Sequence, residues 1–229
     1  NAFWESKGVA NAEEFRQFSA PVVPLARFSK AVYKNNEQFT ADIEIANYSS
    51  KEINNKNIKW ALTNASGQPL QEGIIPLTNI KIGGGNIAGK ISCSLSEVKK
   101  AERLTLRVSI ENSSYKNTWN IWVYPATLTI EKEEIVVTDK LTETQKALAA
   151  GKTVLFNPPY QLCAGLQGKF VPVFWSPVHF PKQAGTMGLL LDPTHKAFAH
   201  FPTEGHTNWQ WWSLTTQSRT LVIDSIYQH

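Results

Sequence analysis

Apolar and polar residues alternate with a period of two through much of residues 26–124, and this pattern constrains the fold more than any other feature. In the clearest run, residues 39–48, every second side chain from Phe39 to Asn47 points to one face of a strand, and the opposite face is mostly polar. Shorter runs repeat the alternation, separated by turn residues, at 58–62, 104–110 and 119–125. About seven or eight short strands without helices predict an antiparallel β-sandwich of the immunoglobulin-like kind over residues 26–125.

Three local features refine this prediction. Cys93 is in line with Ile91 and Leu95 on the expected buried face, which is typical of a small buried hydrophobe. Trp60 is a candidate for the tryptophan that fills the core of such a sandwich. The glycine triplet at 83–85 is interpreted as a loop, and it is not a phosphate cradle because no helix with Lys-Ser/Thr follows it.

The pattern changes near residue 125, where a βαβ unit is predicted. A strand, a helix and a second strand are expected at residues 134–138, 143–150 and 152–156. Thr142 fits the N-cap of this helix and Gly151 fits the position just past its C-terminus. Such a unit predicts a right-handed parallel crossover, with ligands usually bound beyond the carboxyl ends of the strands.

The rest of the chain is rich in aromatic residues. The pair Asp192–Pro193 is interpreted as a helix start with Pro193 at its first position, and residues 220–224 as a last apolar strand. Residues 126–229 are therefore expected to form a small α/β domain, complete or truncated.

Composition and charge exclude several classes of protein. The chain has 229 residues, of which 42% are hydrophobic and 18% charged, so it can form packed cores and is neither disordered nor collagen-like. No apolar run approaches the roughly 20 residues that a membrane helix needs. The net charge is only +4, with no stripe of Lys and Arg, so no nucleic-acid partner is expected. Two cysteines suffice for neither a disulfide framework nor a four-cysteine zinc site.

Two groups of residues invite a catalytic or metal hypothesis. His195, His200 and His206 lie close in sequence, but the first two are five residues apart and would point to different faces of a helix. We therefore expect no metal site and no cofactor, and we expect these side chains to hold a loop together through hydrogen bonds to backbone. Cys163 follows the second strand of the βαβ unit, but no nucleophile elbow surrounds it, since Gln161 occupies the first small-residue position.

The tryptophans near the C-terminus favour a sugar-binding hypothesis. Indole faces stack on the apolar faces of pyranose rings, and nearby polar groups can satisfy the hydroxyls. We take Trp209, Trp211 and Trp212, with His206 and Glu204, as candidate carbohydrate-binding residues. An extended segment would place Trp209 and Trp211 on one face and Trp212 on the other. The alternative is that the indoles fill a core.

Several stretches together resemble the C-terminal region of family 2 glycoside hydrolases of the β-galactosidase-like kind. Residues 2–9, 15–18, 21–27 and 33–37 resemble the segment that leaves the catalytic barrel. Residues 45–48 and 117–125 look like the β-sandwich that follows. Residues 201–204 with 209–211 resemble a later region similar to glutamine-amidotransferase-like, or flavodoxin-like, α/β domains.

The resemblance implies a non-catalytic accessory role. The only methionine is Met187, so the chain is expected to be a fragment or a mature protein trimmed after export. Family members use two barrel glutamates, which would precede Asn1, so no catalytic residue carries over. Residues 1–25 would be the connector from that barrel, which would be the partner of this chain, and analogy implies a periplasmic or secreted protein acting on oligo- or polysaccharide. The alternatives are a free-standing carbohydrate-binding protein and a cysteine hydrolase that uses Cys163.

Overall fold

The computed structural model describes residues 5, 8, 10–128, 135–169, 178–181, 188–216 and 218–222. The chain divides into two compact units, each described here by itself. The first unit comprises Asn1–Ala126 and His200–Pro202, and the second comprises Thr127–Ala199 and Thr203–His229. No helix in the described part of the chain is long and apolar enough to cross a membrane.

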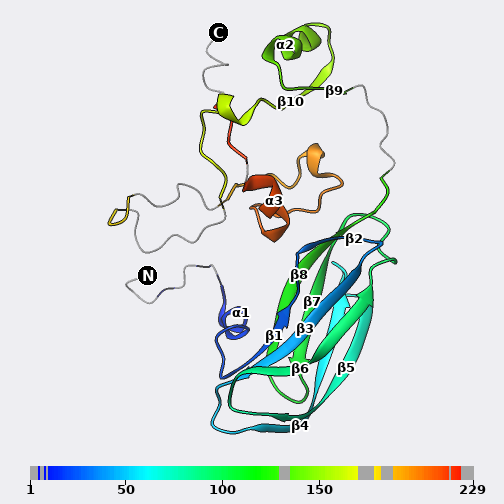
Figure 1. Ribbon diagram of the computed structural model, residues 1–229, viewed down its shortest axis with the longest axis vertical. Coiled ribbons are helices and arrows are strands. Elements are labelled where there is room, and N and C mark those ends of the chain that lie inside the picture. The colour runs from blue at the N-terminus through cyan, green and yellow to red at the C-terminus, as the bar shows by residue number, and fades with distance from the viewer. Residues whose placement is uncertain are drawn as a thin grey trace. The chain divides into compact units, whose positions relative to one another are not determined.

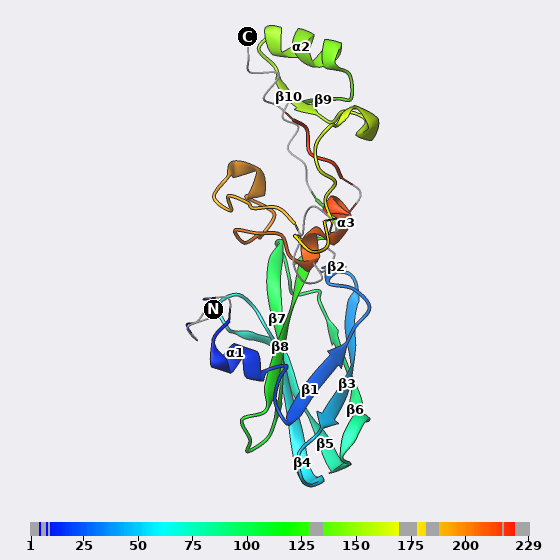
Figure 2. The same ribbon diagram turned by 90° about the vertical axis from the view of Figure 1, so that its left-hand side faces the viewer.

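The first unit is a sandwich of two β-sheets, as the alternation predicts (Figures 1 and 2). A three-stranded sheet has the order β1-β3-β6 and a five-stranded sheet the order β2-β8-β7-β4-β5. All neighbours are antiparallel except β2 and β8, which are parallel. The strands are β1 (Val22–Arg27), β2 (Val32–Lys34), β3 (Gln38–Asn47), β4 (Ile53–Thr63), β5 (Pro69–Ile80), β6 (Gly83–Ser94), β7 (Glu102–Ile110) and β8 (Lys116–Tyr124).

Side chains from both sheets form one core. Along β3, Phe39, Ala41, Ile43 and Ile45 are buried, so this strand has the inward face that its sequence predicts. Facing side chains come from the other strands, among them Ile58, Leu62, Leu104, Leu106, Val108, Ile121 and Val123. Each large aliphatic side chain removed from water in this way contributes about 1.5–3 kcal/mol. Cys93 belongs to the same core, which confirms its prediction as a small buried hydrophobe.

The sandwich begins earlier than its predicted start at residue 26. Strand β1 starts at Val22, which is buried, and it pairs with β3 from Val22 to Arg27. A short helix, α1 (Ala12–Arg16), precedes it and is started by a capping box between Asn11 and Glu14. Helix α1 and the first part of β1 lie within residues 1–25, the stretch that the sequence suggests as a connector.

Two predictions for the sandwich need correction. The triplet Gly83–Gly85 is the start of β6 and not a loop, and Gly83 and Gly85 have φ of +119° and +73°. The register with β3 is irregular here, so the strand needs backbone conformations that only glycine adopts easily. Trp60 is only partly buried and packs against the core, instead of filling its centre.

The second unit contains the predicted βαβ motif. Strands β9 (Ile135–Thr138) and β10 (Thr153–Phe156) are parallel neighbours, and α2 (Leu141–Ala149) connects them. Gly151 has φ +72°, as expected just past the end of a helix. The predicted N-cap at Thr142 is wrong, because the helix already begins at Leu141, and the N-cap residue has no side-chain bond to it.

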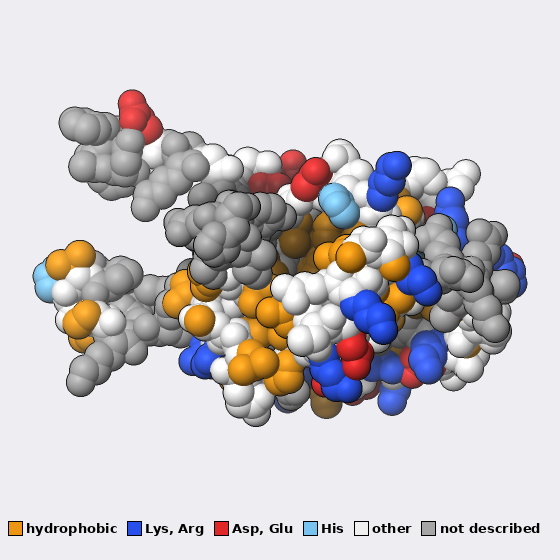
Figure 3. All heavy atoms as spheres, turned by 90° about the horizontal axis from the view of Figure 1, so that it is seen from above, with side chains coloured by type: hydrophobic (Ala, Val, Ile, Leu, Met, Phe, Trp, Pro, Cys, Tyr) orange, Lys and Arg blue, Asp and Glu red, His pale blue; other side chains and the backbone are white. Residues whose placement is uncertain are grey.

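Thr138 organises the start of this helix instead. Its hydroxyl donates to Glu143 and accepts from the backbone N–H of Lys140, with oxygen–oxygen and nitrogen–oxygen distances of 2.7 and 3.1 Å. Several apolar side chains of the motif remain exposed, namely Ile135, Val137, Leu141, Leu148 and Leu155. Hydrophobic atoms are visible at the surface on the face of the molecule drawn in Figure 3.

The structure does not support an amidotransferase-like or flavodoxin-like domain. Such folds need an open parallel sheet with several strands, and the parallel sheet in the described residues has two. The other helical elements are short: η1 (Tyr160–Leu162), η2 (Lys196–Phe198), η3 (Trp209–Trp211) and α3 (Trp212–Thr215).

The two later elements predicted in this unit also differ. The helix expected from Pro193 is only the turn η2, because the Asp192 carboxylate accepts from the N–H and hydroxyl of Thr194 and forms a local turn. Residues 220–222 belong to no strand, and the rest of the predicted last strand lies outside the described residues.

Candidate functional site

A short antiparallel ladder leads into the tryptophan segment of the second unit. The N–H of Leu191 donates to the carbonyl of Gly205, and the N–H of Thr207 donates to the carbonyl of Leu189. The Thr207 hydroxyl also accepts from the N–H of Leu189 at 3.1 Å. The ladder holds the chain in place just before Asn208, where the helical turns begin.

Asn208 starts a helical turn that arranges the tryptophans. Its side-chain oxygen accepts from the N–H of Gln210, which is the bond expected of an N-cap residue. The turn η3 continues directly into α3, so residues three apart lie on one face. The prediction from an extended segment is therefore wrong: Trp209 is grouped with Trp212, and not with Trp211.

Trp209 and Trp212 form an exposed indole pair. Their ring centroids are 5.7 Å apart and the ring planes are inclined by 34°. Trp209 is 66% exposed and Trp212 is 44% exposed, so neither indole fills a core in this unit. An exposed pair of large aromatic rings is a candidate surface for stacking with a flat apolar ligand.

Trp211 has a different environment. Its indole N–H donates to the hydroxyl of Thr203 at 2.9 Å, and its ring meets the edge of Phe198 with centroids 5.7 Å apart. The carbonyl of Trp211 accepts from the hydroxyl of Thr215, which is buried. These contacts make Trp211 a structural residue that supports the turn, whereas Trp209 and Trp212 are exposed to solvent.

The polar candidates lie beside this turn. The Glu204 carboxylate accepts from the side-chain amide of Asn208 at 3.4 Å, so it is linked to the residue that starts the turn. His206 is exposed, and its Nδ1 lies 3.1 Å from the carbonyl of Thr207. His206 is paired with Leu190 in the ladder. The structure thus brings Glu204 to the base of the turn and places His206 in the strand that leads to it.

The other histidines were expected to hold a loop together, and His195 does so. It caps η2, because its Nδ1 accepts from the N–H of Ala197 at 3.2 Å, and its ring meets Phe198. Nearby, hydrogen bonds from Thr194 hold the pKa of the Asp192 carboxyl below its usual value. Across the described residues, no three His, Cys, Asp or Glu side chains converge as metal ligands do.

Cys163 follows η1 and is buried, with 6% of its surface exposed. Its Sγ donates to the carbonyl of Pro159, with the sulfur and oxygen 3.7 Å apart. Arg219 donates to the Cys163 carbonyl at 3.3 Å and lies over the ring of Tyr160. These contacts hold the backbone around the Cys163 thiol in place, as expected of a cysteine with a structural role.

Sequence reasoning overlooked two residues of the site, Asn208 and Thr203. An Asn immediately before an aromatic run is an N-cap signal, and it could have predicted the helical turn and hence the pairing of Trp209 with Trp212. No local sequence signal marks Thr203. Its bond to Trp211 depends on the path of the chain through the ladder between residues 189–191 and 205–207.

Comparisons with known families and proteins add little about chemistry. A family model described as a domain of unknown function, DUF8488, matches residues 37–125. A second one, DUF8487, also described as a domain of unknown function, matches residues 136–229. A search of curated proteins finds no match.

Solved structures share only a distant likeness with this chain. The CARDB domain of a Pyrococcus furiosus protein is 8% identical, with a TM-score of 0.36, over 45% of this chain and 94% of that one. A β-glucuronidase from Parabacteroides merdae is 10% identical, with a TM-score of 0.30, over 44% of this chain. The matched part is only 13% of the glucuronidase chain. Likeness at this level carries no argument about function.

Proposed function

We propose that this chain is a non-catalytic C-terminal accessory region of a family 2-like glycoside hydrolase that acts on glycans. In this proposal the immunoglobulin-like sandwich supports a catalytic barrel in the same parent chain, and the second unit contacts the glycan. The parent would be periplasmic or secreted. The sequence stretches that resemble this family, in the order sandwich then aromatic region, support the assignment.

The exposed indole pair is the observation that carries the glycan contact. A pyranose ring has an apolar face of C–H groups that stacks on indole, and its hydroxyls need polar partners at the rim. Trp209 and Trp212 supply the faces. Glu204 is held nearby by Asn208 and is a carboxylate that can accept from hydroxyls. Such contacts with one sugar are weak, about 4 kcal/mol or a millimolar Kd.

Titration with oligosaccharides tests this contact. The change in tryptophan fluorescence and the NMR shifts of the indole N–H groups would be followed in the full chain and in Trp209→Ala and Trp212→Ala. Each substitution is expected to abolish binding and leave the unfolding temperature nearly unchanged, because both rings are exposed. The matched control is Trp119→Phe in the first unit, which should leave oligosaccharide binding intact.

Two outcomes would contradict the contact. If a panel of β- and α-linked oligosaccharides perturbs neither indole, the glycan contact is wrong. If binding persists in both alanine variants, the contact lies elsewhere.

The absence of catalysis is tested separately. Incubation of this chain with nitrophenyl glycosides should release only background nitrophenol, because the catalytic glutamates of the resembled family lie in its barrel. Turnover that disappears on replacing one carboxylate of this chain would overturn the accessory role. A free-standing carbohydrate-binding protein would give the same titration result, and the two differ in whether a barrel sequence precedes Asn1 in the gene.

A further inference from the structure

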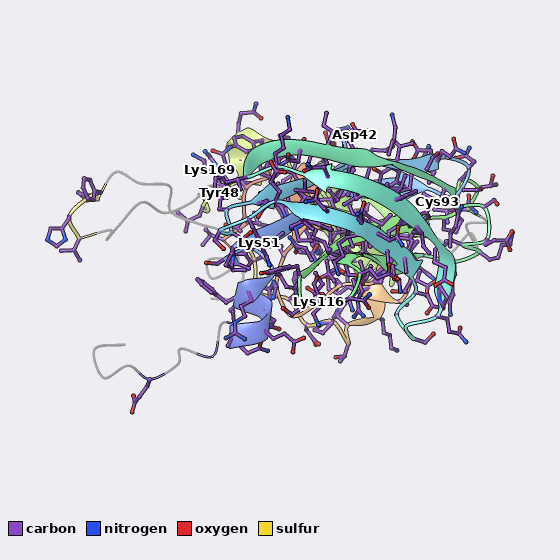
Figure 4. All side chains as sticks on the ribbon, turned by 90° about the horizontal axis from the view of Figure 1, so that it is seen from below. Asp42, Tyr48, Lys51, Cys93, Lys116 and Lys169 are labelled. Atoms are coloured by element: carbon purple, nitrogen blue, oxygen red, sulfur yellow. The ribbon has the colours of Figure 1, made fainter. Side chains whose placement is uncertain are left out.

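A hollow of about 270 Å³ lies in the first unit, on the outer side of the three-stranded sheet. Its lining comes from β1, β3 and β6 and from the residues that follow β1. Thr40 and Asp42 point outward from β3, on the face opposite the buried core. Figure 4 labels Asp42 on this outer surface of the strands.

The charges of the hollow form a row across the sheet. Arg27 is in register with Asp42, and Asp42 is in register with Lys90. A carboxylate therefore lies between two cations on neighbouring strands. Within the described residues, neither Asp42 nor Lys90 forms an ion pair or a side-chain hydrogen bond, so both groups are available to a ligand.

Arg27 is positioned by a contact outside the hollow. Its Nε donates to the Glu44 carboxylate at 2.6 Å, and this bond holds the pKa of Glu44 below its usual value. A guanidinium has five N–H donors, so the remaining donors stay free for another acceptor. Glu44 does not itself line the hollow, and its bond holds Arg27 in place beside it.

This arrangement selects for a ligand with two kinds of group. The Lys90 ammonium and the remaining N–H donors of Arg27 favour a carboxylate, whereas Asp42 repels a simple anion and accepts hydrogen bonds from hydroxyls. A hollow of about 270 Å³ lies below the range of about 300–1,000 Å³ typical of pockets for drug-sized ligands, so it suits a single small residue. We propose that this hollow binds one sugar-acid residue, with its carboxylate on Arg27 and Lys90 and a hydroxyl on Asp42.

The site is independent of the indole pair, because all its residues belong to the first unit. The test uses the full chain labelled with ¹⁵N and titrated with galacturonate, with glucose and acetate as the neutral and simple-anion probes. Galacturonate is expected to shift amides of β1, β3 and β6 with a millimolar Kd, and glucose and acetate are each expected to bind at least about fivefold more weakly.

Substitutions separate the sugar-acid site from general attraction of anions. Lys90→Gln and Arg27→Gln should each weaken galacturonate binding by about fivefold or more. Lys51→Gln removes one exposed positive charge outside the hollow and should leave galacturonate binding nearly unchanged. Asp42→Asn is the decisive variant. Loss of the Asp42 charge should strengthen the binding of acetate. Loss of the hydroxyl contact should lower the ratio of the galacturonate affinity to the acetate affinity.

Two results would overturn the proposal. One is the absence of galacturonate-dependent shifts in β1, β3 and β6. The other is a galacturonate-to-acetate ratio that Asp42→Asn leaves unchanged or raises, because the hollow would then attract anions without recognising a sugar. The variants change exposed side chains, and an unchanged unfolding temperature confirms that each one is folded.

Discussion

The indole of Trp60 lies directly over Gly73 on the neighbouring strand, and a Cβ at Gly73 would come within 2.8 Å of the indole Nε1. The two residues are opposite each other in the pairing of β4 with β5. Trp60 in turn packs against the core of the sandwich. The bare backbone of Gly73 is what lets a large ring lie flat at this position.

Replacing Gly73 by Ala should therefore destabilise the first unit. The added methyl group forces the indole away from the core, and overpacking of this kind costs about 1–3 kcal/mol. The midpoint of urea unfolding measures the change. Gly84→Ala is the matched control, because its Cβ would meet only the hydroxyl of Tyr48, at the end of an exposed side chain.

A second substitution checks the cause. If the clash with the indole is responsible, Trp60→Phe should lower the free energy of unfolding less in the Gly73→Ala background than in the natural chain. Equal costs in both backgrounds would show that the methyl group acts through something other than Trp60.

The first unit was predictable because strand periodicity determines which side chains are buried. The alternation of residues 39–48 identified the inward face of β3, including Phe39 and Ile43, before any partner strand was known. The glycine triplet at 83–85 was not predictable in the same way. Glycines occur in loops and in irregular strand starts alike, and only the pairing of β6 with β3 distinguishes the two.

The candidate site was predictable in composition but not in geometry. The cluster of tryptophans was visible in the sequence, but the choice of an extended segment paired Trp209 with Trp211. The capping bond from Asn208 and the continuation into α3 reverse this grouping. The bond between Trp211 and Thr203 depends on the return of the chain through the ladder, which local sequence does not encode.

Trp211 should be needed for the stability of the second unit. Trp211→Phe removes the hydrogen bond to Thr203 and should cost about 1 kcal/mol. Trp211→Ala also removes the packing against Phe198 and should cost about 2–4 kcal/mol. Thermal unfolding followed by near-UV circular dichroism measures both, with Trp209→Ala expected within about 0.5 kcal/mol of the natural chain. A Trp209→Ala variant as unstable as Trp211→Ala would contradict this division of roles.

The attachment of α1 to the sandwich should depend on pH. Glu13 forms an ion pair with Lys116 of β8, and this bond lowers the pKa of Glu13 below its ordinary value of 4.5. Because the pKa is lower in the folded protein, the contribution of the pair is complete above pH 4.5 and is lost as the pH falls through the lowered value. The protection factors of the α1 amides, which correct for the slower intrinsic exchange in acid, should therefore fall in this acidic range.

Two variants test that attachment. Lys116→Gln should accelerate exchange in α1 already at neutral pH, whereas Glu97→Gln, at an exposed position in the turn after β6, should have no effect. The bond between the side chains of Thr118 and Gln17 remains in both variants, so partial protection should persist. Exchange in α1 that is identical in Lys116→Gln and the natural chain would show that the ion pair does not hold the helix.

The burial of Cys93 should make the stability of the first unit fall at alkaline pH. Cys93 is 1% exposed in the core of the sandwich, and burial raises its pKa from 9.0 to about 11. The unfolded thiol therefore loses its proton first, and stability should decrease as the pH rises from about 9 towards 11. Urea unfolding across this range measures the effect, and Cys93→Ala should show a smaller decrease. An equal decrease in the variant would assign the pH dependence to other groups.

The two thiols should react slowly in the folded protein and in a fixed order. Since the thiolate is the reactive form, Cys93 should not react with a disulfide reagent at mildly alkaline pH until the first unit unfolds. Cys163 is also buried, but the elements around it are short, and local opening should expose it first. Reaction with Ellman's reagent in Cys93→Ala and Cys163→Ala separates the two rates. Both thiols should react at once in guanidinium above about 5 M, which unfolds all but hyperstable domains.

Fast, stoichiometric reaction of Cys163 in the folded protein, abolished by replacing a histidine, would contradict the structural role assigned here and favour a cysteine hydrolase.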